Sequence, residues 1–259
     1  MLRSAVPMLR KLAPILALTG LLAVGCGAEY ERAGADSDAR TLLAETADAT
    51  RELRSAQLDV RVQGDETASL TGAFEVEDEG RLPKFSITAT HDGRSAGATW
   101  TGDKGYVTLD GTAYEVSGLL GGQIEAGFEE AFKNRGLAPD VSRWVRNPRN
   151  AGVADVGGVE TVKITGTADG PRIMGDVQRL LEQARALGLG DRLQRERAAD
   201  AIGTVDVTVF TGSTDRILRR LVVAGDDMRF DLTLTRVDED QGIDAPENAR
   251  PFSELLNQR

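Results

Sequence analysis

The chain has 259 residues, with 31 basic against 41 acidic side chains and a net charge of −10. This acidic balance argues against binding to nucleic acid or to an anionic membrane surface, because both repel negative charge. With one cysteine and one histidine, an intrachain disulfide is impossible, and zinc sites and Cys–His chemistry are excluded in practice.

The N-terminus has the three zones of a secretory signal in the expected order. Its positive start carries Arg3, Arg10 and Lys11. Residues 12–24 then form an apolar run that is too short to span a bilayer comfortably, and small residues surround Cys26. We expect a signal peptide over residues 1–25, cleaved between Gly25 and Cys26. The alternative is that Cys26 is a chance thiol, removed with the signal peptide.

Cys26 and its small neighbours are similar to a bacterial lipobox, in which the cysteine is acylated and becomes residue one. One acyl chain such as palmitate holds a protein weakly, whereas a diacylglyceryl group supplies a second chain and stable anchoring. We therefore expect a lipid-anchored protein on the extracytoplasmic face of the cell membrane. The mature chain then has 28 basic against 41 acidic residues, a net charge of −13. Residues 26–37 would form the lipidated start and a flexible tether.

A helix is expected next, capped by Asp36, Ser37 or Asp38 and ending near Ser55. Short alternating runs of apolar and polar residues follow, separated by turn-formers such as His91-Asp92-Gly93. These runs lie at 58–63, 70–76, 85–89, 106–109 and 113–116. The short links predict an antiparallel meander of five or six strands. One face of this sheet is expected to be polar and solvated (the wet face), and the other apolar (the dry face).

The second half of the chain mixes helices and strands. Residues 117–136 suit a helix or a helical lid, and residues 140–149 suit a short turn anchored by Trp144. Further strands are expected at 151–156, 160–167, 205–209, 218–223 and 230–234, with helices from Pro171 to Gly188 and at 251–256. The order predicts one α+β domain over 38–259: a curved antiparallel sheet, or half-barrel, of about 10–11 strands wrapped over two or three helices. The alternative is an ordinary α+β domain with a solid core.

Several segments resemble a known family. They are SAQLDVRV at 55–62, GYVTLDGTAY at 105–114, VGGVETVKITGT at 156–167 and IDAPENARP at 243–251. With Cys26, the chain resembles the LolA/LppX-like lipoproteins, including the LppX, LprA, LprF and LprG group of actinobacterial envelope proteins. The resemblance implies a half-barrel with an apolar cavity that binds acyl chains of lipids or glycolipids, for transport or retention in the cell envelope. One departure is the stretch 170–202, which is longer than expected and could cap, enlarge or fill the cavity.

Aromatic and aliphatic residues on the dry face and the lid are the candidate cavity lining, with ordinary core packing as the alternative for each. They are Trp100, Tyr106, Leu119, Leu120, Ile124, Phe128, Phe132 and Trp144. Each buried methylene stabilises binding by about 0.8 kcal/mol, so an enclosed 16-carbon chain gains on the order of 10 kcal/mol before ordering costs.

No catalytic constellation is evident. A Ser-His-Asp triad would have to use His91, the sole histidine, which falls in a turn. We expect no enzymatic activity, no cofactor and no metal, and we expect a monomer whose partners are lipids, the membrane and an envelope transporter. The alternative function is an anchored envelope scaffold or sensor without lipid cargo.

Overall fold

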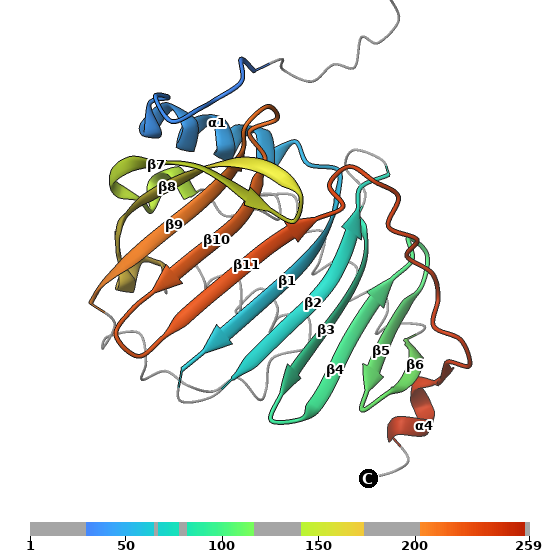
Figure 1. The fold of residues 1–259 in the computed structure, drawn as a ribbon. Coiled ribbons are helices and arrows are strands. Elements are labelled where there is room, and N and C mark those ends of the chain that lie inside the picture. The colour runs from blue at the N-terminus through green and yellow to red at the C-terminus, as the bar shows by residue number, and fades with distance from the viewer. Residues whose placement is uncertain (1–29, 65–66, 78–81, 117–140, 174–202, 257–259) are drawn as a thin grey trace, which may run out of the picture.

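The computed structural model describes residues 30–64, 67–77, 82–116, 141–173 and 203–256 (Figure 1). Its helices are α1 (Ala39–Arg51), the 3-10 helix η1 (Val141–Arg143) and α4 (Phe252–Leu256). Its strands are β1 (Ser55–Gln63), β2 (Ala68–Glu75), β3 (Lys84–His91), β4 (Arg94–Trp100), β5 (Gly105–Leu109), β6 (Thr112–Val116), β7 (Arg146–Val156), β8 (Val159–Asp169), β9 (Thr204–Gly212), β10 (Leu218–Ala224), β11 (Arg229–Thr235) and β12 (Arg250–Pro251). The helices predicted at 117–136 and from Pro171 lie wholly or almost wholly outside the described residues.

All 12 strands belong to one sheet, in the order β12-β6-β5-β4-β3-β2-β1-β11-β10-β9-β8-β7. Two antiparallel meanders, β1–β6 and β7–β11, join where β1 pairs with β11. In the described part of the chain, the parallel contact is the short one between β12 and β6. The predicted fold class, a curved antiparallel sheet with helices, is confirmed. The strand count exceeds the expectation of 10–11 because β12 is a two-residue pairing that carries no sequence signal.

Three of the predicted hairpin turns have the backbone that their residues favour. Asp92-Gly93, Asp110-Gly111 and Gly157-Gly158 each link consecutive strands, and both residues of each pair have positive φ. Two successive positive φ angles define the type I′ turn, whose twist matches that of antiparallel strands. These turns set the register that places apolar side chains on one face of the sheet.

The N-cap of α1 is Asp38, one of the three predicted candidates. Its carboxylate accepts hydrogen bonds from the backbone N–H and the hydroxyl of Thr41, and the backbone bond lowers the pKa of Asp38. The helix ends at Arg51, so the predicted end near Ser55 is wrong. The reason is that Ser55 already pairs with Glu75 in the sheet.

The predicted tether is shorter than expected, because residues 30–37, here called the N-terminal segment, lie against the domain. Ala33 is 3 % exposed and donates its N–H to Ser213 O at 2.8 Å. The Asn150 side-chain amide donates to the carbonyls of Gly34 and Ser37, both at 2.9 Å. Packing and hydrogen bonding by neighbouring strands therefore fix a stretch whose composition predicted flexibility.

The C-terminal segment after β11 runs along the strand ends at one end of the sheet, from β11 to β6 (Figure 1). Asp238 donates its N–H to Ser55 O, and Gln241 N–H donates to the Glu75 carboxylate. This segment ends in β12 and α4 beside β6, as Figure 1 shows in red. α4 confirms the terminal helical turn predicted at 251–256. Among the described residues, no helix has the length and apolar character needed to cross a bilayer.

Strand β7 departs from regular pairing at two places. Its register with β8 shifts between Arg146 and Arg149 and again between Asn150 and Val153. Asn147 and Gly152 have positive φ at these shifts. Each shift is a bulge, which bends the strand and increases its twist.

Candidate functional site

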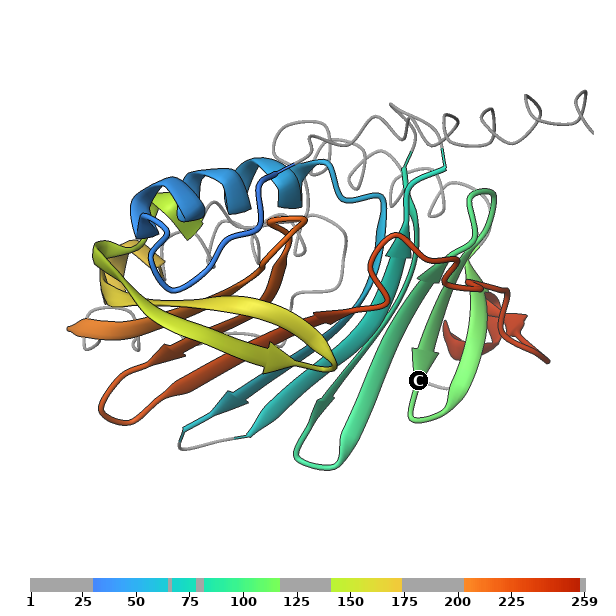
Figure 2. The ribbon, with the colours of Figure 1, turned by 45° about the horizontal axis from the view of Figure 1, so that its top comes forward.

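The dry face of the sheet is the face on which Leu58, Val60 and Val62 of β1 lie. At one end it is covered by α1 (Figure 2). There Leu42 and Leu43 of α1 pack on side chains from β8, β9 and β10. Ile164, Val209 and Leu221 are completely buried. This end of the face is a filled hydrophobic core, so its role is to stabilise the fold.

Beyond α1, the apolar side chains of the dry face are less deeply buried. Leu232, Val60 and Leu70 are directly paired across β11, β1 and β2, with Phe230 and Ile87 beside them on the same face. All five side chains are only partly buried. We call these five residues the apolar strip. A contiguous, partly exposed apolar surface of this kind is typical of a site that binds apolar groups.

Trp100 lies farther along the dry face, paired with Phe85 of β3. Its six-membered ring covers Gly105, where an added Cβ would lie 3.4 Å from the indole. Trp100 is 5 % exposed, and its Nε1 donates to no acceptor among the residues that the structure describes. An unpaired buried donor costs about 1–3 kcal/mol, so a bound ligand with an acceptor oxygen would gain from this indole N–H.

Gly72 is needed for the close approach of β2 and β3. A Cβ at this position would lie 2.4 Å from Ser86 O and 2.8 Å from Ile87 Cγ2. Backbone cannot move aside as a flexible side chain can. We therefore expect Gly72→Ala to lower the free energy of unfolding by about 1–3 kcal/mol, measured by urea denaturation. Gly93→Ala is unsuitable as a control because of its positive φ, whereas Gly34→Ala meets open space and should change stability little.

The structure describes three of the eight predicted lining residues and does not bring them together. Trp100 belongs to the cluster with Phe85, whereas Trp144 belongs to the core under α1. Tyr106 is paired with Thr99, the neighbour of Trp100, so it lies on the opposite face. The other five predicted residues lie outside the described residues: Leu119, Leu120, Ile124, Phe128 and Phe132.

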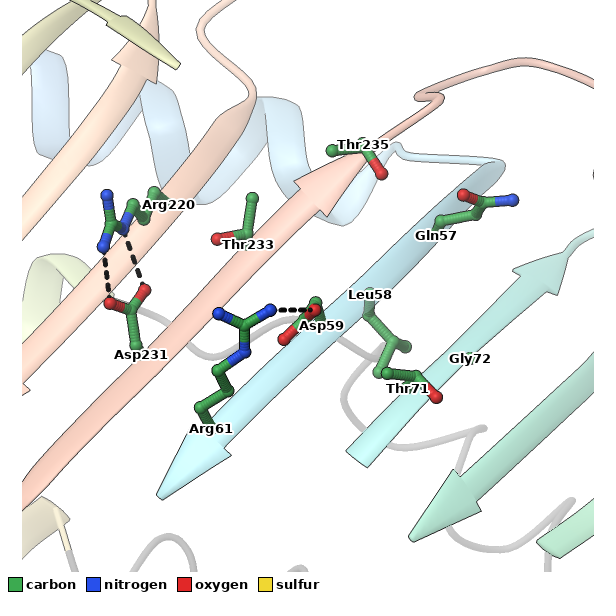
Figure 3. A pocket seen from close by; sticks show the side chains of 10 residues that line it. All are labelled: Gln57, Leu58, Asp59, Arg61, Thr71, Gly72, Arg220, Asp231, Thr233 and Thr235. Atoms are coloured by element: carbon green, nitrogen blue, oxygen red, sulfur yellow. Dashed lines mark hydrogen bonds and ion pairs between the residues drawn. The ribbon is translucent and has the colours of Figure 1, made fainter. Parts of the chain in front are cut away.

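A hollow of about 590 Å³ lies on the wet face, over β10, β11, β1 and β2. Figure 3 shows the ion pairs Arg220–Asp231 and Arg61–Asp59 among its lining side chains. Thr71, Thr233 and other polar groups complete the lining. Charged and hydroxyl groups disfavour hydrocarbon, so this hollow is unsuitable for an acyl chain.

Arg220 and Asp231 form a two-pronged pair, with Nε–Oδ1 at 2.8 Å and Nη2–Oδ2 at 2.6 Å. The hydrogen bonds from Arg220 lower the pKa of Asp231, and the charges of Arg220 and Arg229 add to this. The same hydrogen bond raises the pKa of Arg220. Because the folded pKa of Asp231 is lowered, its stabilising effect is complete above the unfolded value of about 3.9 and is lost as pH falls through the folded value.

We expect Asp231→Asn to lower the free energy of unfolding at pH 7 by about 1–2 kcal/mol, since charge-assisted hydrogen bonds are lost. Below about pH 4 the two chains should differ less in their free energy of unfolding, because Asp231 of the unchanged chain becomes protonated. Urea denaturation at both pH values measures this. Asp59→Asn is the matched control, because the Arg61–Asp59 pair has side chains that are 65 % and 41 % exposed. Equal losses in the two variants would contradict the prediction.

The sole histidine lies at the surface of the domain. His91 ends β3 in the predicted turn, with Nε2 3.4 Å from the Asp92 carboxylate and about half of its side chain exposed. Among the described residues, no group of three His, Cys, Asp or Glu side chains could hold a metal ion. The carboxylates of Asp59 and Asp231 on the wet face form ion pairs with Arg61 and Arg220.

One solved structure shows the fold of this chain. LprF from Mycobacterium bovis superposes with a TM-score of 0.53 at 20 % identity, over 80 % of this chain and 96 % of that one. The chain has the LprF fold. The lipoprotein LppX from Mycobacterium tuberculosis matches 80 % of this chain and 100 % of its own, with a TM-score of 0.49 and 19 % identity. No protein-family model matches the chain, and no curated protein matches it in sequence.

Within the LprF fold, two features escaped the sequence analysis. The alternation of apolar residues identified the strands of the apolar strip, but periodicity alone cannot tell a covered face from a partly open one. The second feature is Arg216, whose side chain is 5 % exposed although it lies in a polar turn between β9 and β10. No sequence signal distinguishes it from the exposed arginines.

Proposed function

We propose that this chain is a membrane-anchored lipoprotein of the cell envelope that binds acyl chains of lipids or glycolipids on the dry face of its sheet. The apolar strip carries the proposal, because it is a contiguous hydrophobic surface whose side chains are only partly buried in an LprF-type fold. Burial of such side chains against hydrocarbon is favourable at about 25 cal/mol per Å². Trp100 Nε1, which has no acceptor among the described residues, suits an ester or hydroxyl oxygen of the same ligand.

The anchor is Cys26, acylated after removal of residues 1–25. Its support is the order of positive, apolar and small residues at the N-terminus. Acylation places the protein on the extracytoplasmic face of the cell membrane, where it transports lipids or retains them. The protein acts as a binding module and not as an enzyme, with a membrane transporter as a further partner.

Native mass spectrometry of the full chain, gently extracted from its own host, tests the lipid binding. The expected spectrum contains masses above that of the acylated chain, which fragment to release lipid. A spectrum of the bare acylated chain alone would contradict lipid binding and favour an anchored scaffold or sensor. Cys26→Ala tests the anchor separately: the variant should move from the membrane fraction to the soluble fraction.

A further inference from the structure

The N-terminal segment is held by groups from three separate parts of the fold. Arg32 forms a bidentate ion pair with Glu160 of β8, with Nη2–Oε2 at 2.7 Å. Asn150 of β7 binds the carbonyls of Gly34 and Ser37. Ser213, between β9 and β10, accepts from the Ala33 N–H. Residues 30–37 are therefore part of the domain. They add no length to residues 26–29, which link the domain to the proposed anchor at Cys26.

Arg216 fixes the first described residues. Its Nε donates to Glu45 of α1 at 2.8 Å, while Nη1 and Nη2 donate to the carbonyls of Ser213 and Glu31. The guanidinium also lies over the Tyr30 ring, 5.2 Å from its centroid. Burial raises the pKa of the Tyr30 phenol, and the carboxylates of Glu45, Glu52 and Asp48 raise it further, so Tyr30 lies alongside α1.

Chain geometry now limits how far the domain can lie from its anchor. Tyr30 follows Cys26 by four residues, which span at most about 14 Å even when fully extended. Were residues 30–37 free, the twelve steps from Cys26 to Asp38 would reach roughly 40 Å. The contacts of Arg216, Asn150 and Glu160 thus shorten the reach about threefold.

We propose that α1 and the N-terminal segment form a surface that is held close to, and faces, the lipid bilayer. The inference rests on the proposed anchoring at Cys26. The exposed side of α1 includes Ala44 and Asp48, and the turn after β3 lies at the other end of the sheet in both views (Figures 1 and 2). The carboxylates on α1 oppose insertion into hydrocarbon, so the surface lies against the headgroups without entering the membrane.

This orientation gives the dry face a defined position. Because α1 packs on the dry face, the side of the sheet that carries the apolar strip is turned toward the bilayer. A lipid that leaves the membrane then meets the strip without crossing the wet face or its ion pairs. The fixed N-terminal segment thus shortens the path between bilayer and binding surface.

Site-specific labels can measure the orientation. Acylation consumes Cys26, so a single cysteine introduced by Ala44→Cys or Asp92→Cys is labelled uniquely. Both sites are exposed. The acylated full chain is reconstituted in phosphatidylcholine nanodiscs with an acceptor dye on the headgroups. Energy transfer from the Ala44 site should clearly exceed transfer from the Asp92 site.

Two changes test the cause of that difference. Inserting about ten Gly and Ser residues between Glu29 and Tyr30 adds roughly 17 Å of average reach without touching the fold, and should largely remove the difference. Arg216→Ala should reduce it, and Arg220→Ala, which breaks an ion pair away from the N-terminal segment, should leave it unchanged. Equal transfer from both labels in an anchored chain overturns the orientation alone. Failure of the chain to float with liposomes overturns the anchoring and the orientation together.

Discussion

Replacing Arg216 with alanine is expected to lower the free energy of unfolding by about 3 kcal/mol, because it breaks a largely buried ion pair. The side chain of Arg216 is 5 % exposed and that of its partner Glu45 is 32 % exposed, which places the loss at the low end of the range for buried pairs. The carbonyls of Ser213 and Glu31 also lose a donor. Urea denaturation of the full chain measures the loss.

The backbone at Arg216 offers an internal comparison. Its φ of 59° lies in the left-handed region, which glycine adopts freely and alanine does not. Arg216→Gly should therefore be about 1 kcal/mol more stable than Arg216→Ala, although both lose the same contacts. Arg32→Ala removes an ion pair whose arginine is 70 % exposed, so it should lower the free energy of unfolding much less than Arg216→Ala does. If Arg216→Ala cost no more than Arg32→Ala, the structural role of Arg216 would be wrong.

Leu70→Asp is expected to weaken acyl-chain binding at least tenfold. Leu70 lies in the middle of the apolar strip, where a carboxylate would face hydrocarbon without a partner. A tenfold loss needs only about 1.4 kcal/mol, and desolvating an unpaired charge costs more than this. Displacement of a fluorescent fatty acid from the full chain measures the affinity.

The neighbouring residue supplies the matched control. Thr71 is exposed on the opposite face of β2, so Thr71→Asp introduces the same charge in the same strand but away from the strip. Its affinity for the fatty acid should match that of the unchanged chain. Urea denaturation of both variants shows whether each is folded. Equal binding by folded Leu70→Asp and Thr71→Asp would place the acyl-chain site elsewhere.

Local rules predicted much of the sheet. Alternation located the strands around Leu58, Ile87 and Val207, and the Asp-Gly and Gly-Gly pairs located hairpin turns with positive φ. These signals are local because strand faces and turn backbones depend on neighbouring residues. β4 was less evident because Ala96, Gly97 and Ala98 alternate weakly in hydrophobicity.

Long-range contacts could not be predicted in the same way. The docking of residues 30–37 depends on Asn150, Glu160 and Arg216, each more than 100 positions away. The face on which Tyr106 lies is set by its pairing with Thr99, which a count of aromatic residues does not reveal. Composition therefore identified the N-terminal segment as polar but gave no sign that the domain binds it.

The bulges in β7 affect how copies of this protein behave when they are crowded together. An open sheet ends in a strand with unpaired backbone groups, which can recruit another chain and start aggregation. β7 is such a terminal strand, yet it is bent at Asn147 and Gly152, and Pro148 lacks an N–H to donate. Arg146 and Arg149 add like charges that repel a second copy of the same edge. The irregularity of this strand thus protects the protein against edge-to-edge polymerisation, even at high local density.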